Sequence, residues 1–302
     1  MTVHQIYSEN AAYQELAALK TNRNKRRRLR SFIVEGVRGI DAAIHYGWRI
    51  ESLLYARGVK LSRWAGGVLE SAGAADAYEL PPTLMERLSG KTETSELIAV
   101  ARMRGAEECA RPGGTAANAA ARTDSSAPAL SESPVLALFD RPSNKGNLGA
   151  LLRSCDAFGV EALYITGHAV DIYDPEVVVS SMGSFFAVPF YELASSADVD
   201  RLFARLKAAH PTLSLIGTSA HAALPVDAAD LRGPVMFLIG NEADGLSWRL
   251  SHICDAMVNI PMGARSFASS LNVSCAATTL FYEVSRQRRA CAPNKSCVHN
   301  SG

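Results

Sequence analysis

The stretch that decides the fold is the apolar run Val135-Leu-Ala-Leu-Phe139 with the segment that follows it, Asp140-Arg-Pro-Ser-Asn-Lys-Gly-Asn-Leu-Gly-Ala-Leu-Leu-Arg-Ser-Cys-Asp-Ala-Phe-Gly159. A short apolar run that ends in turn residues predicts a buried β-strand. Further along, apolar side chains at helical spacing predict a helix that Gly159 caps: Leu148, Leu151, Leu152, Cys155 and Phe158. A strand that leads directly into a helix is the unit of a parallel α/β sheet.

The same alternation continues along the C-terminal half of the chain. Further strands are expected at Ala162–Thr166, Leu213–Gly217, Val235–Ile239 and Met257–Ile260, with helices such as Leu148–Phe158 and Asp198–Ala208 between strands. This pattern predicts a mostly parallel sheet. Ligands of such sheets bind outside the carboxyl ends of the strands, so the residues that follow each strand are the candidates for chemistry.

Residues 106–133 divide the chain, because Ala, Gly, Ser, Pro and Thr dominate this segment and it has no aromatic residue. Such a composition cannot bury enough apolar surface to offset the entropy of ordering, so we expect a flexible linker. It separates an N-terminal part, residues 1–105, from a C-terminal part, residues 134–290. The tail, residues 291–302, is expected to fray.

The N-terminal part is expected to be a small α/β unit. It begins with an amphipathic stretch around Tyr13–Lys20. The expected strands and helices that follow are Ser31–Glu35, Val37–Tyr46, Ile50–Tyr55, a strand end at Tyr78–Leu80, Thr83–Leu88 and Ile98–Met103.

Composition places the chain among ordinary globular proteins, with 48% hydrophobic and 20% charged residues and a formal net charge of +1. The six cysteines form no CxxC pair, which argues against a zinc site and a disulfide framework. Neither a signal-like apolar segment at Met1–Asn10 nor a stretch long enough to cross a bilayer is present. We therefore expect a cytoplasmic protein without a bound metal or a membrane contact.

Charge is concentrated between Lys20 and Arg30, where seven residues are basic and none is acidic. Such a run attracts phosphate, although a solvated helix face would have the same composition. The candidates for RNA contact are Arg23, Lys25, Arg26, Arg27, Arg28 and Arg30.

Polar residues follow three of the expected strands. After Phe139, Asn147 supplies an amide beside a helix start, and Arg153 falls off the apolar stripe of that helix, where a plain surface arginine could equally stand. After Ile239 comes Gly240-Asn-Glu-Ala-Asp-Gly-Leu-Ser247, which could also be an ordinary acidic turn. After Ile260, the stretch Ser269-Ser-Leu-Asn-Val-Ser-Cys-Ala-Ala277 enters a helix of small residues. Such a helix suits a tightly folded site or a dimer contact, and it could also be simply a well-packed helix.

Several common motifs are absent. The chain contains no GxG, so it has no dinucleotide-binding fingerprint and no glycine loop of the Rossmann type. Gly90-Lys91-Thr92 resembles the end of a P-loop, but Met85 stands where the first glycine belongs. Neither HExxH nor GxSxG occurs.

Together the three post-strand segments resemble the three motifs of the SpoU/TrmH family of RNA 2′-O-ribose methyltransferases, members of the knotted SPOUT superfamily. The matching pieces are Asn147-Leu-Gly-Ala-Leu-Leu-Arg153 with Asp156-Ala-Phe-Gly159, Ile239-Gly-Asn-Glu-Ala-Asp-Gly-Leu-Ser247, and Ile260-Pro-Met262 with Ser270-Leu-Asn-Val-Ser274. They occur in the family's order over roughly half of the chain. Phe32-Ile-Val-Glu-Gly36 is similar to the small RNA-binding domain that precedes many rRNA-modifying members.

The resemblance implies an α/β protein whose C-terminal parallel sheet contains a trefoil knot, an exception to the usual unknotted topology. It implies S-adenosylmethionine as the cofactor, bent among the loops of the knot, and a homodimer formed through the first and last helices of the C-terminal part. The stretch Gly263–Ala268 is about two residues longer than usual for the family. The implied cofactor contacts are Thr218, Ser219, Ala220, Leu238, Gly240, Asn241, Gly245, Ile260, Met262 and Leu271.

The resemblance also implies the catalytic set. Family members place an arginine, here Arg153, at the target phosphate and the 2′-hydroxyl. Because a guanidinium is always protonated in proteins, we expect Arg153 to contact the phosphate and stabilise the developing alkoxide instead of acting as a base. Asn147, Glu242, Ser270 and Asn272 would hold the loops, the nucleotide and Arg153 in place.

The expected function is therefore S-adenosylmethionine-dependent 2′-O-methylation of structured RNA, with ribosomal RNA of the large subunit favoured because the N-terminal part is sizeable. Two alternatives stay open: methylation of tRNA, and a non-catalytic RNA-binding assembly factor on the same scaffold. Neither the target nucleotide nor the choice between housekeeping and antibiotic resistance follows from the residues.

Overall fold

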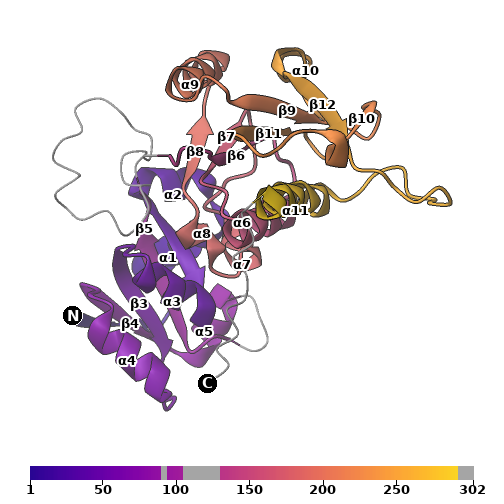
Figure 1. Ribbon diagram of the computed structural model, residues 1–302. Helices are drawn as coiled ribbons and strands as arrows, with labels where there is room; N and C mark the ends of the chain where they lie inside the picture. The colour runs from indigo at the N-terminus through magenta and orange to yellow at the C-terminus, as the bar shows by residue number, and fades with distance from the viewer. Residues whose placement is uncertain (90–93, 105–129, 292–302) are drawn as a thin grey trace, which may run out of the picture.

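The computed structural model describes residues 1–89, 94–104 and 130–291, which form two sheets (Figure 1). The N-terminal sheet has the strand order β1-β4-β3-β5-β2. Strands β1 and β3 pair in parallel with β4, whereas β5 runs antiparallel to β2 and β3. The elements are β1 Thr2–Gln5, α1 Ala11–Thr21, α2 Arg23–Leu29, β2 Ser31–Glu35, α3 Val37–His45, β3 Ile50–Ala56, α4 Arg63–Ser71, β4 Asp76–Leu80, α5 Pro82–Ser89 and β5 Leu97–Arg102.

The C-terminal sheet has seven strands in the order β10-β12-β9-β11-β6-β7-β8, and every adjacent pair is parallel. Its elements are β6 Val135–Asp140, α6 Lys145–Ala157, β7 Ala162–Thr166, α7 Pro175–Ser180, α8 Ser184–Ala187, β8 Phe190–Leu193, α9 Ser196–Ala209, β9 Ser214–Thr218, β10 Leu224–Pro225, β11 Val235–Ile239, α10 Trp248–Ile253, β12 Ala256–Asn259 and α11 Val273–Cys291. No helix in the described part of the chain is long and apolar enough to span a bilayer.

Helices cover both faces of this sheet (Figure 1). Successive side chains of a strand point to opposite faces. In β6, Leu136 and Leu138 therefore pack with α9 and α10, whereas Ala137 and Phe139 pack with α6 and α11. A central strand that is buried on both faces explains why the sequence of β6 is apolar throughout.

The structure confirms the strands and helices predicted from periodicity to within a few residues at their ends. Sequence analysis missed β1, α4, α7, α8, β8, β10 and α10. Most of these elements are short, and their apolar residues complete too few turns or alternations to reveal a period.

Most of the predicted linker, residues 106–129, lies outside the described residues, as does the tail beyond Cys291. The last residues of the predicted linker are ordered. Leu130 packs against the apolar side chains beneath α9 and α10, and the backbone N–H and hydroxyl of Ser131 donate to the Glu161 carboxylate at 2.8 and 2.6 Å. The C-terminal fold therefore begins before residue 134.

An aromatic cluster joins the N-terminal and C-terminal parts. Phe32 of β2 lies 5.5 Å from Phe185 of α8, measured between ring centroids, and Trp48 lies 5.4 Å from Phe186 and 6.5 Å from Phe190. The Trp48 indole N–H also donates to the Phe186 carbonyl at 3.1 Å. All five rings belong to one continuous hydrophobic core, so the two parts are not independent units joined by a linker alone.

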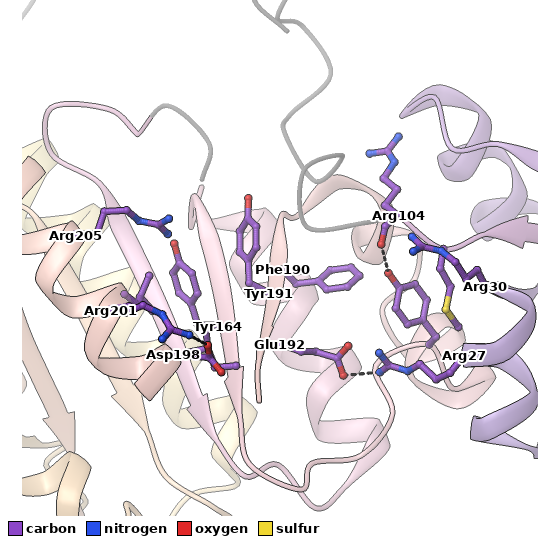
Figure 2. Close-up of a pocket in the computed structure, with 14 residues that line it drawn as sticks. Arg27, Arg30, Arg104, Tyr164, Phe190, Tyr191, Glu192, Asp198, Arg201 and Arg205 are labelled. Carbon is purple, nitrogen blue, oxygen red and sulfur yellow. Dashed lines mark hydrogen bonds and ion pairs between the residues drawn. The ribbon is translucent and has the colours of Figure 1, made fainter. Parts of the chain in front are cut away.

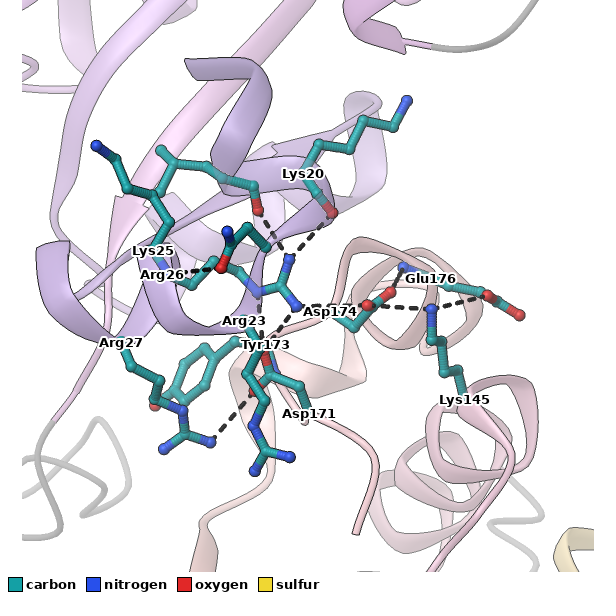
Figure 3. A network of polar contacts seen from close by, with 12 residues as sticks. Lys20, Arg23, Lys25, Arg26, Arg27, Lys145, Asp171, Tyr173, Asp174 and Glu176 are labelled. Carbon is teal, nitrogen blue, oxygen red and sulfur yellow. Dashed lines mark hydrogen bonds and ion pairs between the residues drawn. The ribbon is translucent and has the colours of Figure 1, made fainter. Parts of the chain in front are cut away.

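Arg26 adds a buried ion pair to the same interface (Figure 3). Its side chain is 2% exposed. Its guanidinium donates to the Asp171 carboxylate at 2.8 Å, pairs with Asp174 at 3.4 Å and donates to the Leu19 carbonyl at 2.9 Å. The prediction that Arg26 binds RNA is therefore wrong, because carboxylates and carbonyls of the protein already occupy the donors of its guanidinium.

Other members of the basic run also have protein partners. Arg27 pairs with Asp171 at 3.2 Å and with Glu192 at 2.5 Å, and Arg23 donates to the Ala169 carbonyl at 3.0 Å. Lys25 pairs with Glu15 at 3.0 Å. Arg28 and Arg30 remain exposed without a carboxylate partner in the described part of the chain. Much of the run therefore joins the two parts of the protein. RNA contact stays a prediction for Arg23, Lys25, Arg27, Arg28 and Arg30.

Candidate active site

A cavity of about 890 Å³ opens at the carboxyl ends of β9, β11 and β12, beside the start of α11. We call it the strand-end cavity. Its size suits a cofactor or a small ligand. Its walls contain nearly all of the predicted site residues: Asn147, Thr218, Ser219, Ala220, Gly240, Asn241, Glu242, Gly245, Ile260, Met262, Ser270, Leu271 and Asn272.

Of the predicted catalytic and cofactor-binding residues, two are not part of this wall. Leu238 is buried in β11, and its carbonyl accepts a hydrogen bond from the Thr218 hydroxyl at 3.2 Å, so it supports the cavity from behind. Arg153 lies on α6 with its side chain exposed. Within the described residues Arg153 has no hydrogen-bond or ion-pair partner, which leaves its guanidinium available to an external group.

The Glu242 carboxylate organises one side of the cavity. It accepts hydrogen bonds from the backbone N–H and hydroxyl of Ser143 at 3.0 and 2.7 Å, from the backbone N–H of Asn144 at 3.1 Å and from the Asn147 amide at 3.2 Å. Burial alone would raise the pKa of Glu242, but the donors from Ser143 and Asn147 outweigh it and hold this pKa below its ordinary value. An ionised carboxylate thus joins the loop after β11 to the loop after β6.

Asn147 extends this contact to the third segment. Its side-chain oxygen accepts from the Asn272 amide at 2.9 Å, while its own amide donates to Glu242. The Asn272 oxygen in turn accepts from the Ser274 backbone N–H at 3.0 Å and caps the start of α11. A continuous chain of hydrogen bonds, Glu242–Asn147–Asn272, therefore joins the three segments that the sequence singled out.

Asn241 and Asp140 fix the 240–247 loop. The Asn241 amide donates to the Arg141 carbonyl at 2.7 Å, and its oxygen accepts from the Ala243 backbone at 2.8 Å. The buried Asp140 carboxylate accepts from the Thr166 hydroxyl at 2.6 Å and from the Ser247 backbone at 2.8 Å. These bonds hold the two ends of the 240–247 loop against β6.

Gly240 is required by close packing within this loop. A Cβ at this position would lie 2.3 Å from the carbonyl carbon of Gly245 and 2.3 Å from the backbone nitrogen of Leu246. Backbone atoms at this distance cannot be displaced by a side-chain rotation, so any other residue would open the loop.

Residues 261–272 form an exposed arm between β12 and α11 that extends away from the body of the protein (Figure 1). Met262 and Leu271, near its two ends, line the strand-end cavity, whereas Phe267 is fully exposed. This arm contains Gly263–Ala268, the stretch that the resemblance implied to be longer than usual.

The start of α11 differs from its predicted role. Its small and apolar residues were expected to form a dimer contact. Ala277, Leu280, Phe281 and Val284 are instead buried within the subunit, in the core that contains α6 and β11. Their spacing reflects packing inside the subunit, so it is no evidence for a dimer.

The sequence pattern did not single out Ser143, Asn144 or Asp140 as site residues. Ser143 and Asn144 donate to Glu242, and Asp140 fixes the 240–247 loop. All three directly follow, or end, β6, so the rule that placed Asn147 could have found them.

Two family models match the chain. Residues 134–282 match the SpoU rRNA methylase family, and residues 10–99 match the SpoU L30e-like domain.

Individual relatives agree with these matches. The chain is 38% identical over 283 residues to a 23S rRNA (uridine(2479)-2′-O)-methyltransferase of Streptomyces viridochromogenes, an alignment covering 94% of this chain and 92% of the relative. The crystal structure of the SpoU methyltransferase AviRb from Streptomyces viridochromogenes, in complex with AdoMet, superposes with a TM-score of 0.82 at 37% identity, covering 93% of this chain and 99% of that one. The 23S rRNA (guanosine-2′-O-)-methyltransferase RlmB of Coxiella burnetii is 33% identical over 54% of this chain and 63% of its own length.

Proposed function

Because the chain belongs to the SpoU rRNA methylase family, we propose that it transfers a methyl group from S-adenosylmethionine to a ribose 2′-hydroxyl of 23S ribosomal RNA. The observation that carries this proposal is the hydrogen-bonded chain Glu242–Asn147–Asn272 beside the strand-end cavity. A non-catalytic assembly factor would have no need to keep these side chains joined around a cavity of cofactor size.

The strand-end cavity fits the cofactor. Ile260, Met262 and Leu271 offer apolar surface for an adenine ring, and the backbone around Gly240 offers hydrogen-bonding groups. S-adenosylmethionine, when bound, supplies an electrophilic methyl group on a positively charged sulfur. Glu242 already accepts four hydrogen bonds from the protein, so it positions the loops and is a poor candidate for a general base.

Arg153 is assigned to the RNA. Its guanidinium is exposed and has no partner in the described residues, so it can form two parallel hydrogen bonds to a phosphate. Held there, it would orient the ribose and stabilise negative charge that develops on the 2′-oxygen as the proton leaves.

The trefoil knot remains part of the proposal. The relevant segments are the 240–247 loop, which packs so tightly that Gly240 lies against Gly245, and the arm 261–272 that leads into α11. A crystal structure that traces the backbone through these two segments tests the knot. A C-terminal segment that passes through a loop of the chain supports the knot, and one that passes beside the loop contradicts it.

We also infer a homodimer through α6 and its neighbours. Helix α6 packs with α7 and α11, and exposed apolar side chains lie on or just after those neighbours: Val179, Met182 and Tyr282. A twofold assembly would use the same patch on both subunits. Sedimentation at micromolar concentration tests it, because a single species near the monomer mass of 32.3 kDa would exclude the dimer.

The substrate class is tested by incubating the protein with tritiated S-adenosylmethionine and, separately, purified 23S rRNA, 16S rRNA and tRNA. We expect label in 23S rRNA only. Label in tRNA would support the alternative function, and label in none of the three would contradict methyl transfer to RNA from these pools. A variant of the same chain, Arg153→Ala, is the control for label incorporated by contaminating enzymes.

A further inference from the structure

A second pocket, of about 720 Å³, lies along the free edge of β8, between α9 and the N-terminal part (Figure 2). We call it the edge-strand pocket. It shares no lining residue with the strand-end cavity. Five arginines and two carboxylates line it, together with four aromatic residues, so its wall is both positively charged and aromatic.

Tyr164 carries an unsatisfied polar group at this pocket. Its side chain is 1% exposed, and its hydroxyl has no hydrogen-bond partner in the described part of the chain. The ring stacks on Tyr191 with centroids 5.3 Å apart, and Figure 2 shows the hydroxyl directed toward the Arg205 guanidinium. Burial raises the pKa of Tyr164 to about 12, against the charge of Arg205, so the hydroxyl stays a hydrogen-bond donor at neutral pH. A buried donor without an acceptor is costly unless a ligand supplies one.

The positive charge of the pocket is only partly neutralised by protein groups. Arg27 pairs with Glu192, and Arg201 pairs with Asp198. Arg30, from the end of α2, and Arg205, from α9, have no carboxylate partner in the described residues. Two guanidiniums from the two parts of the protein thus face one pocket that also holds an unpaired hydroxyl.

We propose that the edge-strand pocket binds a backbone phosphate of the RNA substrate, with Arg205 and the Tyr164 hydroxyl as donors to its oxygens and Arg30 as a second positive charge. The half-buried ring of Tyr191 adds aromatic surface for a neighbouring unpaired base. This inference rests on the proposed function, since it assigns the substrate of that function to a specific surface. In this proposal Arg30 is the member of the basic run that lies near the phosphate. The sequence did not single out Arg205, its partner from the C-terminal part.

The test compares Arg205→Ala and Tyr164→Phe with Lys207→Ala in the full chain. Lys207 lies on the same helix but outside the pocket, where it pairs with Asp255. Its removal therefore lowers the charge of α9 by the same one unit as Arg205→Ala. Binding to a 23S rRNA transcript is measured by filter retention at several salt concentrations. We expect Arg205→Ala to weaken binding about tenfold and to reduce the salt slope by about one phosphate contact. Tyr164→Phe should weaken binding about threefold with an unchanged or higher melting temperature, because it removes an unsatisfied buried group.

Two results would overturn the inference. One is binding within about twofold of the parent for both pocket variants at every salt concentration. The other combines two observations. Inorganic phosphate raises the melting temperature of the parent but not of Arg205→Ala, and the RNA affinity of Arg205→Ala equals that of the parent. The pocket would then be a site for a free phosphate compound. Methyl transfer is measured in the same samples. A parent protein that binds the transcript but transfers no methyl group would contradict the proposed function, and the binding data would still decide the inference.

Discussion

Among single residues, Arg153 and Glu242 differ in the number of protein groups that they contact, and this difference separates their roles. Arg153 is exposed and has no partner in the described residues, so it contributes little to folding. Glu242 accepts four hydrogen bonds and joins two loops, so it contributes to the shape of the cavity. Substitutions at these positions should therefore affect different measured quantities.

For Arg153→Ala we expect methyl transfer to fall at least about 100-fold, because the phosphate contact and the stabilisation of the developing alkoxide are both lost. The melting temperature and the affinity for S-adenosylmethionine should equal those of the parent. Arg153→Lys should also be poor, because a point charge does not replace a planar fork. Single-turnover assays measure the effect, and activity within a few-fold of the parent would refute the assigned role.

For Glu242→Gln we expect weaker cofactor binding and lower stability at neutral pH, because an amide accepts these hydrogen bonds less strongly than a carboxylate. The pKa of Glu242 is held below its ordinary value of 4.5, so its contribution to stability is present above that value and is lost as the pH falls below it. Urea unfolding of parent and variant should therefore give curves that differ at pH 7 and approach one another at acidic pH. A difference that grows with acidity would contradict this assignment.

Among elements, helix α2 shows where sequence and structure diverge. Its basic residues have the composition of a phosphate-binding face, yet the carboxylate partners of Arg26 lie 145 and 148 positions away in the chain. Composition cannot reveal a pairing over that distance. The long strands and helices, in contrast, were predictable because their apolar periods are set locally, and the site residues after β6, β11 and β12 were predictable because parallel strands end at one edge.

For Arg26→Ala we expect the free energy of unfolding to fall by about 3–5 kcal/mol, because the buried Asp171 would lose its buried charge partner and keep only the partly exposed Arg27. Arg28→Ala is the matched control on the same helix, with an exposed side chain, and should change stability by less than about 0.5 kcal/mol. Denaturant titrations of both variants measure the difference. If both variants changed the free energy of unfolding by the same small amount, the buried ion pair of Arg26 would not contribute to stability.

For the whole molecule, the shared aromatic core means that neither the N-terminal nor the C-terminal part has a complete core by itself. Phe32 and Trp48 of the N-terminal part pack against Phe185, Phe186 and Phe190 of the C-terminal part. A fragment without residues 1–105 would expose these rings to water. Substrate contacts and cofactor loops therefore belong to one cooperative structure.

The whole chain should consequently unfold in a single thermal transition, with equal calorimetric and van't Hoff enthalpies. Trp48→Ala should lower the temperature of that transition as a whole, because it removes a large buried side chain from the shared core. Differential scanning calorimetry provides the measurement. Two separate transitions, only one of which shifts in Trp48→Ala, would show that the parts fold independently.

The proposed function requires that the methyl group goes to a ribose oxygen, and alkaline hydrolysis of the labelled RNA tests this directly. Alkali cleaves RNA through attack by the free 2′-oxygen, so a 2′-O-methylated nucleotide stays joined to its neighbour. After reaction with tritiated S-adenosylmethionine, 23S rRNA should yield its label in alkali-resistant dinucleotides, and the Arg153→Ala variant should yield none. Label recovered in mononucleotides would place the methyl group on a base and contradict the account.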